Sequence, residues 1–323
     1  MATFLGGKVG SFRDAFKVAN TDVLRWFPGH MGKGIKQMEA NLKNVDCVIE
    51  VHDARIPISG RYADFKKTLC GLKPHILILT KVDLTDKTYL VPALNLLQKE
   101  GIRNVIQTNL KDDTCKESKK ILPLVKRLIK ESDRFNRSDE KDYCIMVIGV
   151  PNVGKSSLIN RLRNLHLHKA NAAPVGNVAG ITKSVATKIK ISVDPLVYLL
   201  DTPGILPPHI KDVNSGLKLA AVKCSPDHLV GPQMLADYLL FWFNKNHRFD
   251  YVEKLGLKEA TDDIIEVLIQ IAVKQKKIKK FRNFDGQIVQ RPDLHWASEY
   301  FLKAFRSGDL GFYCLDKDLL END

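Results

Sequence analysis

The feature that most constrains this chain is a glycine loop, GVPNVGKSS at residues 149–157, which lies between a strand-like and a helix-like segment. The apolar run at 144–148 predicts a buried parallel strand, and residues 157–162 have the pattern of a starting helix. Glycines in this context let backbone N–H groups surround phosphates, and the helix N-terminus adds its partial positive charge. The loop therefore predicts a nucleoside-triphosphate site on an α/β sheet.

The polar residues of this loop have distinct expected roles. We expect Lys155 to contact the β- and γ-phosphates and to act in catalysis, and the Ser156 hydroxyl to ligate Mg²⁺. Further nucleotide contacts are expected from Asn152, Val153, Gly154 and Ser157. A chance glycine-rich turn would lack this combination of strand, loop, Lys-Ser pair and helix.

Two later segments fit the parts of a nucleotidase that sense the γ-phosphate. The sequence DTPG at 201–204 follows the apolar run 196–200, so Asp201 would hold Mg²⁺ through water and the Gly204 N–H would sense the γ-phosphate. Residues 163–183 lack a clear periodicity and predict a long loop. Thr182, near the end of that loop, fits a threonine that joins the Mg²⁺ shell and takes part in hydrolysis.

A fourth segment, TKVD at 80–83, follows the strand-like run 75–79 and fits a guanine-binding motif. The Asp83 carboxylate would pair with the ring N–H and exocyclic amine of guanine, the Lys81 stem would pack over the ring, and Thr80 would support the base. The next predicted strand, 104–107, ends at Thr108 and Asn109, which we expect on the same side of the nucleotide. Each short motif alone is often a plain turn. Together, each after a strand, they indicate a GTPase.

The order of these motifs is unusual, because the base motif precedes the phosphate loop. The expected fold is therefore α/β, a circularly permuted Ras-like P-loop GTPase domain followed by a small all-α C-terminal domain. We assign 1–24 to a basic N-terminal segment, 25–224 to the GTPase domain, and 225–323 to a helical domain that contacts RNA or the ribosome. In this order, the segment after Asp201 continues directly into the helical domain, which suits a switch.

The charge of the chain is concentrated before the helical domain. From residue 225 onward there are 14 Lys and Arg against 16 Asp and Glu, whereas residues 1–224 hold 36 against 21. Such a surplus predicts a polyanionic partner, most simply RNA, although a merely solvated basic surface is the alternative. Residues 274–282 add six positive charges and Phe281, which predict either an RNA contact or a solvated helix end. Cations expected near the switch region are Arg161, Arg163, Lys169, Lys183, Lys188 and Lys190. The acidic residues 309–323 are expected to be peripheral.

The remaining composition bounds the location of the protein. No window approaches 18 uninterrupted apolar residues, so no transmembrane segment is expected. The six cysteines are far apart and form no CxxC pair, which fits a reducing compartment. Residues 1–24 have a weak basic and amphipathic pattern. A mitochondrial transit peptide and an ordinary N-terminal helix of the folded domain are both compatible with it.

Together with two further motifs, the permuted motif order resembles a known family. The permuted order, FPGHM at 27–31, DARIP at 53–57 and GVPNVGKS at 149–156 resemble the RbgA/YlqF family of circularly permuted GTPases, and the basic N-terminus is most like its mitochondrial member. The resemblance implies a GTPase that uses GTP/GDP and Mg²⁺, acts in assembly of the large ribosomal subunit, and contacts its rRNA. It implies a mitochondrial matrix location, with peripheral association to a membrane-bound ribosome as an extension and a cytoplasmic location as the alternative.

The chain departs from the family pattern at two positions. Thr80 stands where the base motif normally begins with Asn, and Ile205 stands after DTPG, where many GTPases have a water-orienting Gln. The resemblance implies that such families carry a hydrophobic residue there, and it offers His30 as the group that positions water. It also implies that Asn152 helps to hold a K⁺ ion.

Two other functions remain open from the sequence. An RNA-binding scaffold with a purely structural nucleotide would keep the same motifs, and Thr80 also permits an ATP-dependent P-loop enzyme. The leading hypothesis is a GTP-dependent assembly switch that is slow alone and is stimulated by a precursor of the large subunit.

Overall fold

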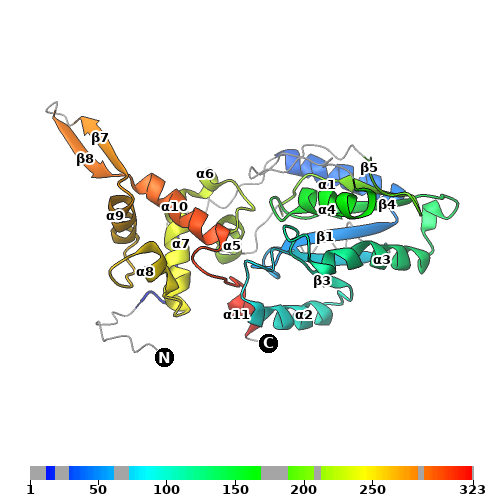
Figure 1. Ribbon diagram of the computed structural model, residues 1–323, viewed down its shortest axis with the longest axis horizontal. Coiled ribbons are helices and arrows are strands. Elements are labelled where there is room, and N and C mark those ends of the chain that lie inside the picture. Colours follow the sequence, from blue (N-terminus) through cyan, green and yellow to red (C-terminus); the bar gives the residue numbers. More distant parts are fainter. Residues whose placement is uncertain are drawn as a thin grey trace. The chain divides into compact units, whose positions relative to one another are not determined.

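The computed structural model describes residues 12–18, 29–61, 73–168, 188–206, 212–282 and 287–321, without the side chains of 29–34, 136 and 281. The chain forms two compact units. The sheet unit comprises residues 24–226 and 312–323, and the helical unit comprises residues 1–23 and 227–311. The larger part of the helical unit, residues 227–311, is therefore an insertion, because the chain leaves the sheet unit after Pro226 and returns to it at Phe312 (Figure 1).

A six-stranded sheet with the order β3-β2-β1-β4-β6-β5 forms the centre of the sheet unit. All neighbouring pairs are parallel except β5 with β6, which is antiparallel. Strands β2 and β4 are nearly continuous apolar runs and are buried, as expected for a parallel sheet between helices. The strands are β1 (Cys47–Asp53), β2 (His75–Thr80), β3 (Val105–Gln107), β4 (Tyr143–Ile148), β5 (Lys188–Ser192) and β6 (Val197–Asp201). This sheet confirms the predicted α/β fold.

The strand order shows the permutation directly. The phosphate-loop strand β4 pairs on one side with β1, from earlier in the chain, and on the other with β6, from later in the chain. Because β1, β2, β4 and β6 are parallel, their carboxyl ends lie at one edge of the sheet, where ligands bind in such folds. Asp53 lies opposite Thr80, and Val147 lies opposite Asp201. The predicted motifs therefore meet at one edge.

Helices accompany this sheet in the sheet unit. The described ones are α1 (Gly29–Asn41), α2 (Leu90–Lys99), α3 (Lys116–Lys130), α4 (Lys155–Leu167), α5 (Val213–Ala221) and α11 (Lys317–Leu320), with 3-10 turns η2 (Leu42–Asn44), η4 (Lys87–Tyr89) and η5 (Phe135–Arg137). Among all described helices, none is long and apolar enough to cross a membrane.

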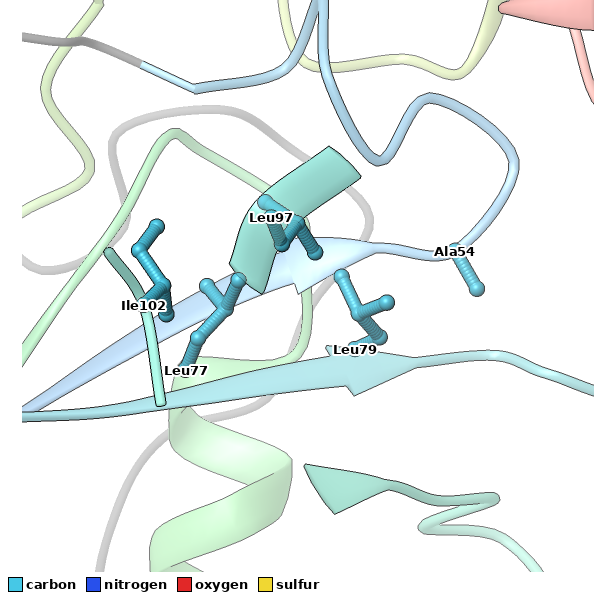
Figure 2. Packing of buried hydrophobic residues seen from close by; sticks show 5 residues of the cluster. All are labelled: Ala54, Leu77, Leu79, Leu97 and Ile102. Carbon is cyan, nitrogen blue, oxygen red and sulfur yellow. The ribbon is translucent and has the colours of Figure 1, made fainter. Parts of the chain in front are cut away.

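One buried cluster fixes the end of β1 and β2 relative to α2. Leu77 and Leu79 on β2 point toward Leu97 on α2, with Ala54 and Ile102 at either side (Figure 2). Ile58 and Val82 pack against the same cluster from the loops that follow the two strands. The core therefore extends under the loops that carry the predicted site.

The segment between α3 and β4, predicted as a plain charged linker, is anchored at its middle. The buried Asp46 carboxylate accepts hydrogen bonds from Arg134 Nε at 3.1 Å, Arg137 Nε at 3.1 Å and Cys144 N at 2.7 Å. Charge-assisted bonds of this kind hold a chain firmly because each buried charge has its partner. This segment leads directly into the phosphate-loop strand, so Asp46 fixes the entry of β4.

Aromatic packing forms the core of the helical unit. The Phe243 ring on α7 lies 5.6 Å from the ring of Tyr251, 6.2 Å from that of Phe301 and 6.1 Å from that of Phe305. Pairs at these distances add to the stabilisation that burial alone provides. The helices of this unit are α6 (Asp227–Val230), α7 (Pro232–Lys245), α8 (Asp250–Leu255), α9 (Ile264–Lys274) and α10 (Leu294–Ser307).

A two-stranded hairpin, β7 (Ile278–Arg282) with β8 (Ile288–Pro292), accompanies these helices and was not predicted. The apolar periodicity alone predicts one helix over 264–278, but α9 ends at Lys274, and Lys276 has a left-handed φ of 54°. That conformation ends a helix because a side chain is disfavoured there. The basic residues after 274 therefore lie mainly on a hairpin.

Two segments pack elsewhere than the predicted boundaries place them. Residues 12–18 belong to the helical unit, where Arg13 pairs with Asp237 at 2.7 Å and Phe16 packs on Tyr238 at 5.4 Å. Residues 312–323, expected to be acidic and peripheral, belong to the sheet unit, and Leu315 is fully buried there. Charge alone suggested exposure, but the acids of this segment find partners far away in the sequence.

We predict that Asp46→Asn destabilises the sheet unit by about 3 kcal/mol, because Arg134 and Arg137 lose the buried carboxylate that they share and Arg137 keeps only Asp142. Glu131→Gln is the control, since its pair with Arg127 is 4.0 Å long and 63% exposed, and it should cost less than about 0.5 kcal/mol. Chemical denaturation, with hydrogen exchange at the β4 amides, measures both. Equal stability of the two variants would contradict the anchoring role.

Candidate functional site

Two glycines shape the phosphate loop at the start of α4. Gly149 has a φ of +146°, and a Cβ there would lie 2.3 Å from the carbonyl oxygen of Val51 on the adjacent strand. Gly154 has a φ of +105° and directly precedes α4. Only glycine suits these positions, since one requires close backbone approach and both require conformations that side chains disfavour. The loop therefore turns tightly at the sheet edge and ends at the N-terminus of α4, the arrangement that phosphate binding requires.

Lys155 is folded into this loop. Its Nζ donates to the carbonyl oxygens of Gly149 at 3.1 Å and Val150 at 2.9 Å, and its side chain is buried. Burial lowers the pKa of Lys155 to about 8, although the nearby Asp201 carboxylate and Cys224 act to raise it. Phosphate oxygens would favour the charged ammonium far more than the two carbonyls do. The Lys155 ammonium thus lies in the loop, where it can exchange these two carbonyl partners for the oxygens of an anion.

Two oxygen donors suited to Mg²⁺ lie beside the lysine. Ser156 Oγ on α4 is 3.4 Å from Asp201 Oδ2 at the end of β6. A hydroxyl with a carboxylate is the hard-oxygen set that Mg²⁺ uses next to phosphates, either directly or through water. The residues present therefore fit this ion. Thr182, the third predicted member of the Mg²⁺ shell, lies outside the described residues.

The segment after Asp201 packs directly against the phosphate loop. A Cβ on Gly204 would lie 2.6 Å from Pro151 Cα, and Ile205 N donates to the carbonyl oxygen of Gly149 at 3.2 Å. The Ile205 side chain is fully buried, so it serves packing and cannot orient water. The predicted sensor segment and the predicted phosphate loop therefore touch through backbone atoms. A ligand that changes one of them must move the other.

On the base side, Thr80 connects β2 to the phosphate loop. Its hydroxyl lies 2.5 Å from the carbonyl oxygen of Val153 and 3.0 Å from that of His52, and it is buried. Both partners accept, so the single hydroxyl proton of Thr80 is already used. Thr80 was predicted to support the base. The structure gives it a tethering role beneath the loop and leaves it no donor for guanine.

Lys81 and Asp83 follow this tether. Lys81 adopts a left-handed φ of 57°, and its Nζ bonds to Asp53 Oδ2 and the carbonyl oxygen of Asn152, both at 2.8 Å. Its stem therefore crosses from the base loop to the phosphate loop. Asp83 Oδ1 is buried and has no hydrogen-bond partner among the described residues. A buried carboxylate oxygen without donors is costly unless a ligand supplies them.

A buried ion pair supports Lys81 from below. Asp53, at the end of β1, accepts from Arg55 Nε at 2.9 Å and from a terminal nitrogen of Arg55 at 2.7 Å. Burial alone would raise the pKa of Asp53, but the charges of Arg55 and Lys81 hold it well below its usual range. Asp53 stays ionised and fixes the Lys81 ammonium. The sequence placed Asp53 at a ligand-binding strand end but did not show that it orients Lys81.

The other predicted contacts are placed as follows. Thr108 is buried, with its hydroxyl 2.8 Å from Ser118 Oγ, and Asn109 Oδ1 caps the next turn by accepting from Lys111 N at 3.0 Å. Asn152 has a φ of 60°, and its amide nitrogen donates to the carbonyl oxygen of Lys223 at 2.8 Å. These side chains stabilise the loops around the site. The contact between Asn152 and Lys223, from the end of α5, carried no signal in the sequence.

Two further predictions concern residues at the border of the site. His30 lies in α1, but its side chain lies outside the description. Arg161, grouped with the cations of the switch region, instead pairs with Asp113 and donates to the carbonyl oxygen of Asp112 at 3.3 Å. Because Arg161 is buried in that pair, it is unavailable to an external polyanion. Of the same group, Lys169 and Lys183 also lie outside the described residues.

Comparisons with known proteins agree with this arrangement. Residues 144–281 match the family model described as 50S ribosome-binding GTPase, and residues 80–83 lie before this match. The chain is 56% identical to Mitochondrial GTPase 1 of Aedes aegypti over 95% of this chain and 98% of the relative. It is 49% identical to Mitochondrial ribosome-associated GTPase 1 of Bos taurus, over 96% and 94% of the two chains. It is 34% identical to Ribosome biogenesis GTPase A of Bacillus licheniformis, over 78% and 86%.

A solved structure shows the same fold. The crystal structure of GNP-bound YlqF from T. maritima superposes with a TM-score of 0.54 at 24% identity, over 86% of this chain and 95% of that one. At this identity the likeness concerns the fold, and it agrees with the permuted strand order described above.

We predict that nucleotide binding takes up a proton above pH 8. The pKa of Lys155 in the free protein is about 8, and phosphate oxygens raise it in the complex, so affinity should fall by up to about tenfold per pH unit above 8. Calorimetry at pH 9 in two buffers of different ionisation enthalpy measures the uptake. Lys155→Arg stays charged and should abolish it. An affinity that is constant from pH 7.5 to 9.5 would contradict the prediction.

Proposed function

This chain belongs to the RbgA/YlqF family of circularly permuted GTPases, and we propose that it acts as a GTP-dependent assembly factor for the large subunit of the mitochondrial ribosome. The family membership makes the protein a GTPase that uses GTP and GDP. Its relatives named for mitochondria and for the ribosome support the compartment and the partner. A place in the matrix, peripheral to the inner membrane through the ribosome, follows from that partner.

The observation that carries the nucleotide assignment is the buried Asp83 oxygen, which has no hydrogen-bond partner among the described residues and follows Lys81, a contact of the phosphate loop. Guanine offers two adjacent donors, the ring N–H and the exocyclic amine, and adenine does not offer this pair. A site whose buried acceptor is satisfied only by guanine discriminates strongly against other bases. This feature supports GTP over ATP even though Thr80 replaces the usual Asn.

For hydrolysis, Ser156, Asp201 and Thr182 would hold Mg²⁺, and the ion would neutralise charge that develops on the phosphates. Lys155 binds the β- and γ-phosphates, and the Gly204 N–H responds to the γ-phosphate. Ile205 is buried and inert, so water must be positioned by another group. We assign this role to His30, which the FPGHM motif supplies. The Asn152 Oδ1 atom remains for K⁺, because its amide nitrogen is engaged.

The RNA contact is assigned to the basic hairpin of the helical unit. Lys276, Lys280 and Arg282 are exposed there, while Lys279 pairs with Asp293 at 2.9 Å and Lys277 lies over the Trp296 ring at 5.1 Å. Several exposed cations on one small element suit binding to an RNA backbone, and such binding weakens as salt rises. On the sheet unit, Lys188 adds an exposed cation at the edge strand β5.

The assembly role is tested by sedimentation and turnover together. Purified protein should hydrolyse GTP slowly, and large-subunit particles from mitochondria should accelerate it. Co-sedimentation with those particles should occur with a non-hydrolysable GTP analogue and not with GDP. Lys155→Ala, if folded, should lose both effects. Particles that leave the rate and the sedimentation unchanged would refute the assembly role.

We predict that Asp83→Asn exchanges guanine for xanthine specificity. An amide donates to the 2-oxo group of xanthine but faces the exocyclic amine of guanine with a donor, so GDP affinity should fall about 100-fold or more and XDP affinity should rise. Fluorescent nucleotide titration measures both. The control Asp86→Asn keeps the acceptor for Thr88 N and should change neither affinity. Unaltered GDP binding by Asp83→Asn would refute the base assignment.

A further inference from the structure

The returning C-terminal segment, residues 312–321, contains the buried carboxylate of Asp316, which holds a loop of the sheet unit. Asp316 is fully buried and accepts from Ile58 N and Ser59 N, both at 2.8 Å, and from Ser59 Oγ at 2.5 Å. Lys218 Nζ on α5 donates at 3.2 Å to Asp316 Oδ1, the oxygen that also accepts from Ser59 Oγ. Removing this carboxylate would leave two backbone donors unpaired in the interior, and Lys218 would keep only its pair with Asp318.

The loop that Asp316 holds begins at Asp53, the carboxylate that binds the Lys81 ammonium. Residues 53–59 run from Asp53, which fixes Lys81, to Ser59. Leu315 N donates to the carbonyl oxygen of Arg55 at 2.8 Å, so the returning segment contacts the loop at both ends. The path from Asp316 to the Lys81 ammonium therefore consists of one short loop and the Asp53–Arg55 ion pair.

The same loop also holds the far side of the Asp83 loop. Thr85, two residues after Asp83, donates its hydroxyl to the carbonyl oxygen of Ala54 at 3.1 Å, with a longer contact to that of Tyr313 at 3.5 Å. Ala54 N in turn donates to the carbonyl oxygen of Thr80 at 2.9 Å. Residues 80–85 are thus bonded at both ends to the loop that Asp316 organises.

Apolar packing repeats this connection. Ile58 packs against the cluster of Ala93, Cys314 and Leu320, two of which belong to the returning segment. Ile58 also packs against the cluster of Figure 2, which Val82 contacts as well. Val82 directly precedes Asp83. A shift of the returning segment must therefore move a side chain that also supports the base loop, because packed interiors do not deform continuously.

From these contacts we infer that Asp316 is a positioning residue for guanine recognition, which rests on the proposed base-reading role of Asp83. It touches no nucleotide and acts by setting the loop that orients Lys81 and Asp83. Its partner Lys218 lies on α5, downstream of the segment that senses the γ-phosphate. Asp316 therefore joins base recognition to α5 at the place where the chain returns from the helical unit.

The test compares GDP with IDP, which lacks the exocyclic amine that Asp83 accepts from. Wild-type protein should prefer GDP by about tenfold or more. In Asp316→Ala the GDP affinity should fall about tenfold, the IDP affinity should change much less, and the preference should approach one. Asp318→Asn is the matched control, because Asp318 also accepts from Lys218, at 2.7 Å, but is half exposed, and it should retain the preference.

A merely structural role would lower the fraction of binding-competent protein or weaken both nucleotides equally, and either result would overturn the inference. If Asp316→Ala does not fold, Ser59→Ala decides, since it removes one bond to Asp316 and should reduce the preference partially; an unchanged preference refutes the inference. A wild-type preference near one would instead refute the base-reading role of Asp83, and both proposals would fail together.

Discussion

The parallel pairing of β1, β2, β4 and β6 is the constraint on which the rest of this structure depends. It places the ends of four strands at one edge, so that Asp53, Thr80, Gly149 and Asp201 meet although they are far apart in the chain. The glycines of the phosphate loop allow that loop to approach the neighbouring strand closely. The order in which the strands occur along the chain does not affect this geometry, which explains how a permuted sequence builds the same site.

Permutation changes what the ends of the domain are attached to. The entry to β4 is a connection between strands instead of a chain terminus, and Asp46 with two arginines holds it in place. The exit after α5 leads into the helical unit, whose chain returns to the sheet unit at Phe312. Residues 227–311 of the helical unit are therefore connected along the chain to the sheet unit at both of their ends, after α5 and before the segment that carries Asp316. These two connections give the nucleotide two covalent routes to the hairpin proposed to contact RNA.

Sequence patterns were sufficient for the strands, the phosphate loop and the permuted order, because each depends on local periodicity and short motifs. They failed where the partner is remote. The Thr80 hydroxyl meets Val153, 73 residues away, and Asp316 meets Ser59, 257 residues away, so neither role has a local signal. The hairpin after Lys274 was missed because its many charged residues interrupt the apolar alternation by which a strand is recognised. Such charges occur on any exposed element and do not distinguish a strand from a helix. Acidic content likewise concealed that residues 313–316 are buried.

In this protein the segment after Asp201 would sense the γ-phosphate, and the resulting conformational change would reach both connections of residues 227–311 to the sheet unit. Hydrogen exchange of the full chain, compared between GDP and a non-hydrolysable GTP analogue, tests this most directly. The account predicts coordinated changes in protection at residues 202–206, in α5 around Lys218, and at residues 313–316. Changes confined to the phosphate loop and the base loop, with α5 and the returning segment unaltered, would contradict it.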